Sequence, residues 1–374
     1  MRAFMRALAL IALLLSVAAS FVLYRLASGQ TKIGLGGKDV RVPLKWLSEP
    51  PPPGERLPAG DYGRKIDHGG LERFYEMHVP AGKRSEAEYP LVLVFHGGGS
   101  YPAAVRYESR MDEVSNRHGF LVVYPAGTNR LRFPKDRLLL WNDGRPYQDG
   151  RPNEVDDVGF VSALLADVGR IAPIDPLRIY AAGYSNGAQF VTRLVKQLPE
   201  PIAAIAAVAG QRGPDEPFPA PTRPISIMQF AGLEDELGPY RGGQPKEKVP
   251  LVTMLKPVPE VIKAWAAFNA CPETPARRTV KGAEELTYRP GREGAEVVLW
   301  TLKDGGHTWP GGNVLPAVAE KVGRVNHDIF AAEEMWKFFK KHPLNEKYAR
   351  RKAAYLPTNL LFPDRIVIEF SRKE

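Results

Sequence analysis

The stretch that decides the fold spans residues 178–198 and reads RIYAAGYSNGAQFVTRLVKQL. Residues 178–182 have the composition of a buried strand, and residues 188–198 that of a helix. Between them lies Gly183-Tyr184-Ser185-Asn186-Gly187, a G-x-S-x-G sequence at a strand-to-helix turn. Such a turn exposes the serine hydroxyl, and its glycines relieve crowding. Ser185 is therefore the candidate nucleophile, and the alternative is a serine that only caps an ordinary helix.

Other segments with alternating strand and helix character lie on both sides of this turn. Short apolar runs of the kind found in central parallel strands are bounded by glycine or proline. Strands are expected at residues 72–79, 91–95, 120–124, 178–182, 202–208, 225–230 and 297–302, and helices at 156–171, 188–198 and 329–341. This alternation predicts an α/β fold with a mostly parallel central sheet flanked by helices.

A glycine-rich turn, His96-Gly97-Gly98-Gly99, follows the expected strand at residues 91–95. Attack on a carbonyl group creates an oxyanion, which preorganised N–H donors stabilise. Backbone without side chains can approach the substrate closely. We expect one donor to be the backbone N–H of Asn186 and the other that of Gly98 or Gly97, with Gly98 preferred. A plain tight turn is the alternative.

A histidine on a second glycine-rich segment, Gly305-Gly306-His307-Thr308-Trp309-Pro310, follows the last expected strand. His307 can take a proton from Ser185 and return it to a leaving group. The order serine, acid, histidine along the chain places the acid between them. After the strand at residues 225–230 come three consecutive carboxylates, and spacing alone leaves the choice among them open: Glu234, Asp235 and Glu236.

With these motifs, the chain resembles the polyhydroxybutyrate depolymerase-like esterases, which include secreted feruloyl and acetylxylan esterases. The resemblance covers roughly residues 69–342 and rests on VFHGGG, GFLVVYPAGT, Trp141-Asn142, VDDVGFVSAL, YAAGYSNGAQ, the acid loop and GGHTWPGG. In that family a Pro-Tyr pair follows the acid, so Pro239-Tyr240 here selects Asp235. The chain departs from the pattern at Ala231, where a histidine is common, and at Glu236, where a proline is common.

The resemblance implies an α/β-hydrolase fold and a serine esterase that needs no metal and no cofactor. Carboxylic esters would be cleaved through an acyl-enzyme on Ser185, and hydroxyalkanoate oligomers and feruloyl or acetyl esters are the candidate substrates. Asp156 and Asp157 would lie beside the site, although helix-terminal charge is an equal explanation. The residues expected to contact the substrate are Trp141, Trp309 and Tyr184, with core packing as the alternative for Trp141.

Two other functions are considered on the same scaffold. A peptidase of the prolyl-oligopeptidase type would need a large additional propeller or lid, for which residues 61–342 leave no room. A non-catalytic binding protein would have lost a member of the serine, acid and histidine set, whereas all three residue types are present.

The two ends of the chain differ from its middle. Residues 1–27 have the layout of a signal peptide, with Arg2 and Arg6 before an apolar stretch, and residues 7–24 could instead stay as a membrane anchor. We expect a Pro- and Gly-rich linker at residues 28–60, a catalytic domain at 61–342 and a basic extension at 343–374. Secretion to the periplasm or the exterior is expected, or else tethering to the membrane.

The net charge of +9 is concentrated at these ends. Residues 61–342 carry 36 basic and 35 acidic side chains and are nearly neutral. A nucleic-acid partner is therefore not expected. The single cysteine, Cys271, cannot form an intrachain disulfide, and the seven histidines are scattered without a zinc-binding pattern.

Overall fold

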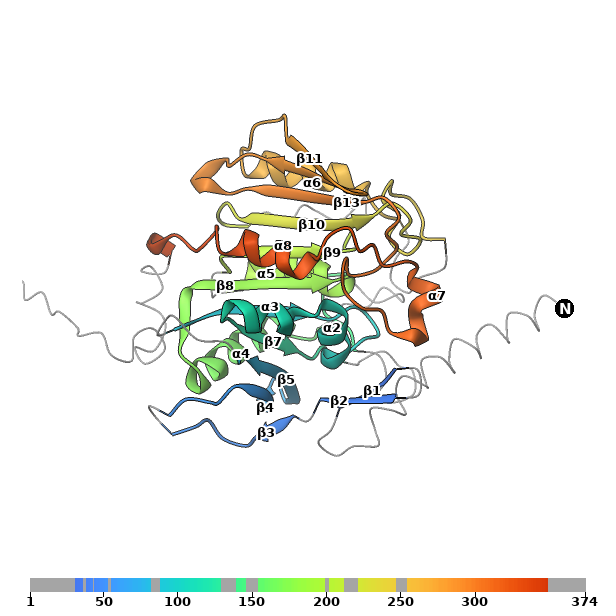
Figure 1. Cartoon of the computed structure of the whole chain (residues 1–374). Coiled ribbons are helices and arrows are strands. Elements are labelled where there is room, and N and C mark those ends of the chain that lie inside the picture. The colour runs from blue at the N-terminus through green and yellow to red at the C-terminus, as the bar shows by residue number, and fades with distance from the viewer. Residues whose placement is uncertain are drawn as a thin grey trace, which may run out of the picture.

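A large sheet with helices on both faces forms the body of the protein in this computed structural model (Figure 1). The structure describes residues 31–35, 38–42, 44–52, 55–81, 88–128, 139–145, 154–198, 202–211, 221–246 and 254–348. Over these residues the sheet has 11 strands, and its central pairings are parallel. The mostly parallel sheet predicted from the sequence is therefore confirmed.

The strands follow one another across the sheet in an order that differs from their order along the chain. From edge to edge they are β11 (Ala276–Val280), β12 (Ala283–Tyr288), β13 (Val297–Leu302), β10 (Ser226–Gly232), β9 (Ala204–Val208), β8 (Ile174–Tyr184), β6 (Tyr89–Phe95), β7 (Leu121–Pro125), β5 (Leu71–Val79), β4 (Gly60–His68) and β3 (Lys45–Leu47). The carboxyl ends of β6, β8, β10 and β13 therefore lie at one edge of the sheet.

Alternate side chains of the central strands enter two separate cores. In β6, Leu91, Leu93 and Phe95 belong to one buried cluster, whereas Val92 and Val94 belong to the other. This alternation follows from the two-residue period of a strand. Because both faces are covered, the strand reads as a continuous apolar run rather than an alternating one.

In the part of the chain that the structure describes, three helices pack on each face of the sheet. On the face of Leu91 lie α4 (Asp157–Ile171), α5 (Asn186–Gln197) and α6 (Val258–Phe268). On the face of Val92 lie α2 (Pro102–Ser109), α3 (Met111–His118) and α8 (Ala331–Phe339), seen in front of the strands in Figure 1. Short helical turns at η1 (Arg292–Gly294), η2 (Pro316–Val318) and α7 (Ala319–Val322) belong to loops.

Several predicted boundaries shift by a few residues. The strand expected at 178–182 is longer and forms β8, and the helix after it begins at Asn186 rather than at residue 188. The strand expected at 202–208 begins at Ala204, and the helix expected at 329–341 is the shorter α8. Fraying at helix ends and differences of one or two residues are usual for such boundaries.

Strands are present within residues 28–60, where a linker is expected. β1 (Thr31–Leu35) and β2 (Lys38–Val42) pair with each other, and β3 pairs in parallel with β4 of the main sheet. The sheet thus begins inside this stretch, and the predicted domain boundaries stay a prediction. Residues 7–24 lie outside the described residues, as does most of the 343–374 extension. Among the helices that the structure describes, none is long and apolar enough to cross a membrane.

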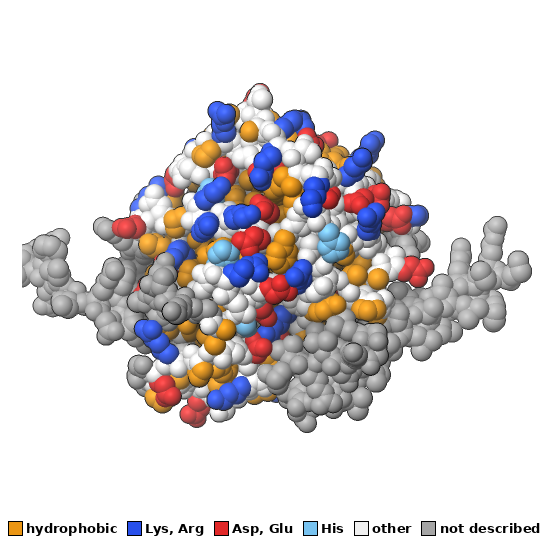
Figure 2. Space-filling view, viewed as in Figure 1, with side chains coloured by type: hydrophobic (Ala, Val, Ile, Leu, Met, Phe, Trp, Pro, Cys, Tyr) orange, Lys and Arg blue, Asp and Glu red, His pale blue; other side chains and the backbone are white. Residues whose placement is uncertain are grey.

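The surface of the described body mixes charges of both signs. On the face shown in Figure 2, lysine and arginine side chains are interspersed with aspartate and glutamate. The exposed edge strand β11 illustrates the arrangement, because Arg277 and Arg278 pair with Glu284 and Glu285 of β12. Charged side chains of this kind protect an edge strand against pairing with other chains.

Candidate active site

Ser185 has a backbone conformation that L-residues rarely adopt. Its φ is 53° and its ψ is −117°, in the turn between β8 and α5. The surrounding backbone holds it there, because Ser185 donates its N–H to Val208 and accepts from Ala188 and Gln189. Such a conformation costs about 1 to 3 kcal/mol and persists where the structure around it enforces it. The serine therefore has the strained turn expected of a nucleophile at this position.

The two glycines that flank the turn are required by close backbone contacts. A Cβ at Gly183 would lie 2.3 Å from the carbonyl oxygen of Gly187. A Cβ at Gly187 would lie 2.4 Å from the carbonyl oxygen of His96. Any side chain at either position would force β8, α5 and the end of β6 apart. The glycines of G-x-S-x-G thus permit the sharp turn that presents Ser185.

Ser185, His307 and Asp235 lie in one hydrogen-bonded line. The Nε2 atom of His307 is 2.9 Å from Ser185 Oγ, and its Nδ1 atom is 2.8 Å from Asp235 Oδ2. A carboxylate only accepts, so Nδ1 carries the ring proton and Nε2 is free to accept from the serine hydroxyl. Asp235 and His307 are buried, with 4% and 7% of their surface exposed.

Asp235 is distinguished from its two acidic neighbours by its orientation. Its Oδ1 atom accepts from the backbone N–H groups of Leu237 and Gly238, which leaves Oδ2 to face the histidine. Glu234 and Glu236 are exposed, and Glu236 pairs with Lys246. Of the three candidate acids, the structure brings only Asp235 into contact with His307.

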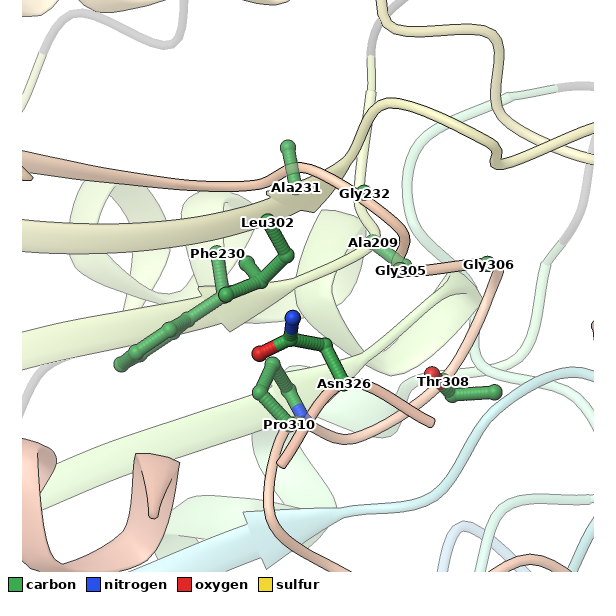
Figure 3. Close-up of a pocket in the computed structure, with 10 residues that line it drawn as sticks. All are labelled: Ala209, Phe230, Ala231, Gly232, Leu302, Gly305, Gly306, Thr308, Pro310 and Asn326. Carbon is green, nitrogen blue, oxygen red and sulfur yellow. The ribbon is translucent and has the colours of Figure 1, made fainter. Parts of the chain in front are cut away.

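The histidine loop is held against the end of β10 by glycine-to-glycine contact. A Cβ at Gly232 would lie 2.0 Å from the carbonyl oxygen of Gly305, and that oxygen accepts from Glu234 N–H. A Cβ at Gly306 would lie 2.4 Å from the carbonyl oxygen of Val322. Gly232, Gly305 and Gly306 all line the pocket drawn in Figure 3. These contacts fix the position from which His307 reaches Ser185.

The proposed oxyanion donors lie beside the serine. A Cβ at Gly97 would be 3.4 Å from Ser185 Cβ, and one at Gly98 would be 3.5 Å from Asn186 Cβ. Within the described residues, no carbonyl accepts from the backbone N–H of Gly98 or of Asn186. Asn186 is the first residue of α5, where helix N–H groups have no intrahelical partner. Both N–H groups are thus available to a ligand next to Ser185.

His96 holds the turn that carries Gly97 and Gly98. Its Nε2 atom accepts from the N–H of Gly127 at 3.0 Å, so its Nδ1 carries the proton and donates to the carbonyl of Gly97 at 2.7 Å. The ring is fully buried, and this burial lowers the pKa of His96 to about 4. His96 is therefore neutral at physiological pH and orients a peptide group of the turn that contains Gly97 and Gly98.

The three aromatic residues expected to contact substrate lie inside the protein. The exposed fractions of Trp141, Trp309 and Tyr184 are 2%, 1% and 8%. Trp141 stacks on Phe190 with ring centroids 4.9 Å apart, and its Nε1 donates to the carbonyl of His96. Tyr184 donates its hydroxyl to the carbonyl of His307. Trp141 thus packs in the core, which is the alternative expected for it, and substrate contact by the three stays a prediction.

Asp156 and Asp157 have different roles at the start of α4. Asp156 caps the helix by accepting from Gly159 N–H and pairs with His68. Asp157 is buried and accepts from Arg73 and from the backbone N–H of Asn142, both at 2.7 Å. Burial raises the pKa of Asp157, against the attraction of Arg73. Helix capping explains Asp156, whereas Asp157 anchors the segment that contains Trp141.

One cluster of the described residues has the spacing of metal ligands. Ligand atoms of Asp61, His78 and Asp112 lie within 4.8 Å of one another. The guanidinium of Arg106 donates to both carboxylates, and Tyr124 donates to Asp112. The guanidinium of Arg106 therefore already pairs with these carboxylates, and the cluster ties α2 and α3 to the sheet.

Glu108 on α2 is a buried acid that the sequence did not single out. Within the described residues its Oε2 atom has no hydrogen-bond partner, and burial raises the pKa of the side chain to about 8. Burial is the main cause of the raised pKa of Tyr184, and the negative charge of Glu108 raises it further. The hydroxyl of Tyr184 donates to the backbone carbonyl of His307. Below about pH 8 the side chain is a neutral carboxylic acid.

Glu108→Gln is expected to remove a pH dependence of stability. A carboxyl group whose pKa is raised in the folded chain makes its full contribution to stability below its unfolded pKa, and this contribution is lost progressively as the pH rises from that value through about 8. Thermal unfolding should therefore show the variant more stable than wild type at pH 8.5, by about 1 to 3 kcal/mol, and similar at pH 5. Glu72→Gln at an exposed site is the control. Parallel Tm curves for wild type and Glu108→Gln would refute this assignment.

Comparison with known proteins supports the predicted relationship. Residues 73–214 match the family described as Esterase PHB depolymerase. NocK of Nocardia uniformis subsp. tsuyamanensis, named as an esterase, is 28% identical over 75% of this chain and 84% of its own length. Feruloyl esterase B of Piromyces equi is 28% identical over 61% of this chain, which spans only 41% of that protein.

The fold is also shared with solved structures. An S-formylglutathione hydrolase from Agrobacterium tumefaciens aligns with a TM-score of 0.50 at 12% identity, covering 76% of this chain and 96% of the other. Likeness at this identity concerns the fold alone, whereas the sequence relatives and the family match concern the chemistry. The predicted resemblance is therefore confirmed, and the chain is a carboxylic ester hydrolase of the α/β-hydrolase fold, similar to the PHB depolymerase esterases.

Proposed function

We propose that this esterase works through an acyl-enzyme on Ser185, with His307 as the general base and Asp235 as the residue that orients it. The observation that supports this most strongly is the line of two hydrogen bonds, 2.8 Å from Asp235 to His307 and 2.9 Å from His307 to Ser185. A serine without such a base is a weak nucleophile, and a histidine without a carboxylate lacks a fixed tautomer.

In the first half of the proposed reaction, Ser185 Oγ attacks the ester carbonyl carbon while its proton moves to His307 Nε2. The carbonyl oxygen becomes an oxyanion that accepts from the N–H groups of Asn186 and Gly98, with Gly97 as the alternative donor. Asp235 stabilises the imidazolium that forms. When the tetrahedral intermediate collapses, the alkoxide leaves with the proton from His307, and the acyl group stays on Ser185.

In the second half, water replaces the alcohol. His307 takes a proton from the water, whose oxygen attacks the acyl carbon, and a second oxyanion forms in the same position. Collapse releases the carboxylic acid and returns the proton from His307 to Ser185 Oγ. These steps use only proton transfer, nucleophilic attack and N–H donors, and none of them requires a metal or a cofactor.

For the substrate, we propose a hydroxyalkanoate oligomer or a feruloyl or acetyl ester. The family match favours the first class, and the relative named feruloyl esterase B favours the second. The composition of residues 1–27 supports export of the chain, with either cleavage of this segment or anchoring through residues 7–24.

A fluorophosphonate probe tests the proposed nucleophile on the wild-type protein. Such probes phosphonylate an activated serine and block acyl transfer. We expect one probe molecule per chain, attached to the peptide that contains Ser185, and loss of p-nitrophenyl butyrate hydrolysis in proportion to labelling. Hydrolysis that continues in fully labelled protein would contradict the proposal. A panel of feruloyl, acetyl and 3-hydroxybutyryl esters then distinguishes the substrate classes.

A further inference from the structure

The segment Leu139–Arg145 connects the two proposed oxyanion donors, which come from parts of the chain far apart in sequence. At one end, the carbonyl of Leu139 accepts from the N–H of Gly99 at 2.9 Å. The side chain of Leu140 covers the adjacent glycine, because a Cβ at Gly98 would lie 2.9 Å from Leu140 Cδ2. This part of the segment therefore holds the turn that carries Gly98.

At its other end, the segment binds the side chain of Asn186. The Oδ1 atom of Asn186 accepts from the backbone N–H of Trp141 at 2.8 Å, and its Nδ2 atom donates to Asp143 Oδ2 at 2.7 Å. A backbone N–H can only donate and a carboxylate can only accept, so these partners define which way the amide points. The side chain of the residue that follows the nucleophile is thus fixed from both sides.

The segment is itself anchored to the core of the protein. The N–H of Asn142 donates to the buried Asp157, which also pairs with the buried Arg73. Arg193 of α5 donates to the carbonyl of Asn142 at 2.7 Å. Asp143 is also held in place, because Arg145 donates to it through both its guanidinium and its backbone N–H. The groups that fix Asn186 are therefore preorganised.

We propose that Asp143 is a positioning residue for ester hydrolysis, acting through the Asn186 side chain on the oxyanion donor of Asn186. The hydrogen bonds of Asp143 in the described part of the chain go to Asn186 and Arg145 rather than to Ser185, so its effect is on the geometry of that N–H. This proposal rests on the proposed function, because it needs an oxyanion to form beside Ser185. Small displacements of a preorganised donor lower the rate, since the donor acts mainly in the transition state.

Asp143→Ala is expected to lower kcat for p-nitrophenyl butyrate by about 10- to 100-fold and to change KM by less than about 3-fold. Asp143→Asn retains an oxygen that accepts from Asn186 Nδ2 and should recover most of the lost kcat. Asp175→Ala is the matched control, because Asp175 also accepts from a nearby backbone N–H and an arginine, Leu177 and Arg178, and lies at the start of β8. That control should keep the wild-type kcat.

Two further measurements separate positioning from loss of folding. A boronic acid that forms a tetrahedral anionic adduct with the serine should bind Asp143→Ala more weakly by the same factor as the loss in kcat. In a double-mutant cycle with Asn186→Ala, the double variant should be no slower than the slower single variant, because both changes break the same contact.

Additive losses in the cycle, or unchanged boronic acid affinity despite a lower kcat, would overturn the proposal. So would a wild-type kcat in Asp143→Ala. Ser185→Ala, measured in parallel, distinguishes this failure from that of the proposed function. If Ser185→Ala is inactive while Asp143→Ala behaves as wild type, only the positioning role is wrong. If Ser185→Ala is active, the acyl-enzyme itself is wrong.

Discussion

Ser185→Ala is expected to lower kcat for p-nitrophenyl esters by about 10⁴- to 10⁶-fold and to leave the fold intact. The variant removes the atom that attacks the carbonyl and keeps the oxyanion donors, so a small residual rate above that of water should remain. Steady-state hydrolysis, with circular dichroism as the check on folding, measures both. Ser226→Ala is a control, because this buried serine is the first residue of β10, where its Oγ accepts from the N–H of Glu296.

Ser185→Gly should be equally inactive but more stable than wild type. Glycine adopts the φ of 53° at this position without the steric cost that a Cβ carries. We expect a gain of about 1 kcal/mol in the free energy of unfolding, measured by denaturant titration. Retained activity in either Ser185 variant would contradict the assignment of the nucleophile.

Asp235→Asn is expected to lower kcat by about 10⁴-fold, although the two side chains have nearly the same shape. The backbone N–H groups of Leu237 and Gly238 both donate to one carboxylate oxygen, so an asparagine would keep its oxygen there. Its NH₂ group would then face His307 Nδ1, which would have to accept rather than donate. The ring proton would move to Nε2, and His307 could no longer take the proton of Ser185.

The neighbouring acids provide controls with the same change of chemistry. Glu234→Gln and Glu236→Gln alter exposed side chains and should change kcat by less than about 3-fold. All variants are compared at one pH with the same ester. A severe loss of kcat in Glu234→Gln or Glu236→Gln, together with a mild loss of kcat in Asp235→Asn, would assign the role of the acid to that neighbouring glutamate instead of Asp235.

The parts of the site that the sequence predicted depend on local geometry. Ser185 and His307 could be singled out because each lies in a short glycine-containing motif whose backbone requirement is visible in the sequence. Asp235 could not be separated from Glu234 and Glu236 by spacing, and only the family resemblance selected it. In the structure, the backbone turn at Leu237 directs the carboxylate of Asp235 inward and leaves those of Glu234 and Glu236 in solvent.

The parts that the sequence did not predict depend on tertiary packing. The hairpin of β11 and β12 has charged residues in place of an apolar run, and its cross-strand ion pairs appear only once the strands are paired. Glu108 is a polar residue on an unpredicted helix, and it is buried where the distant Asn313 donates its N–H to the carbonyl of Glu108. Similarly, the burial of Trp141 depends on Phe190, which lies on another element.

The central claim is that an ester passes through a covalent acyl group on Ser185. Mixing the protein with excess p-nitrophenyl butyrate and quenching in acid within milliseconds, followed by peptide mass analysis, tests it directly. The account predicts a mass increase of one butyryl group on the peptide that contains Ser185, together with a burst of p-nitrophenol equal to the enzyme concentration if deacylation is slower than acylation. A butyryl group on another residue, or a burst of p-nitrophenol without any butyryl group on the peptide that contains Ser185, would contradict the account.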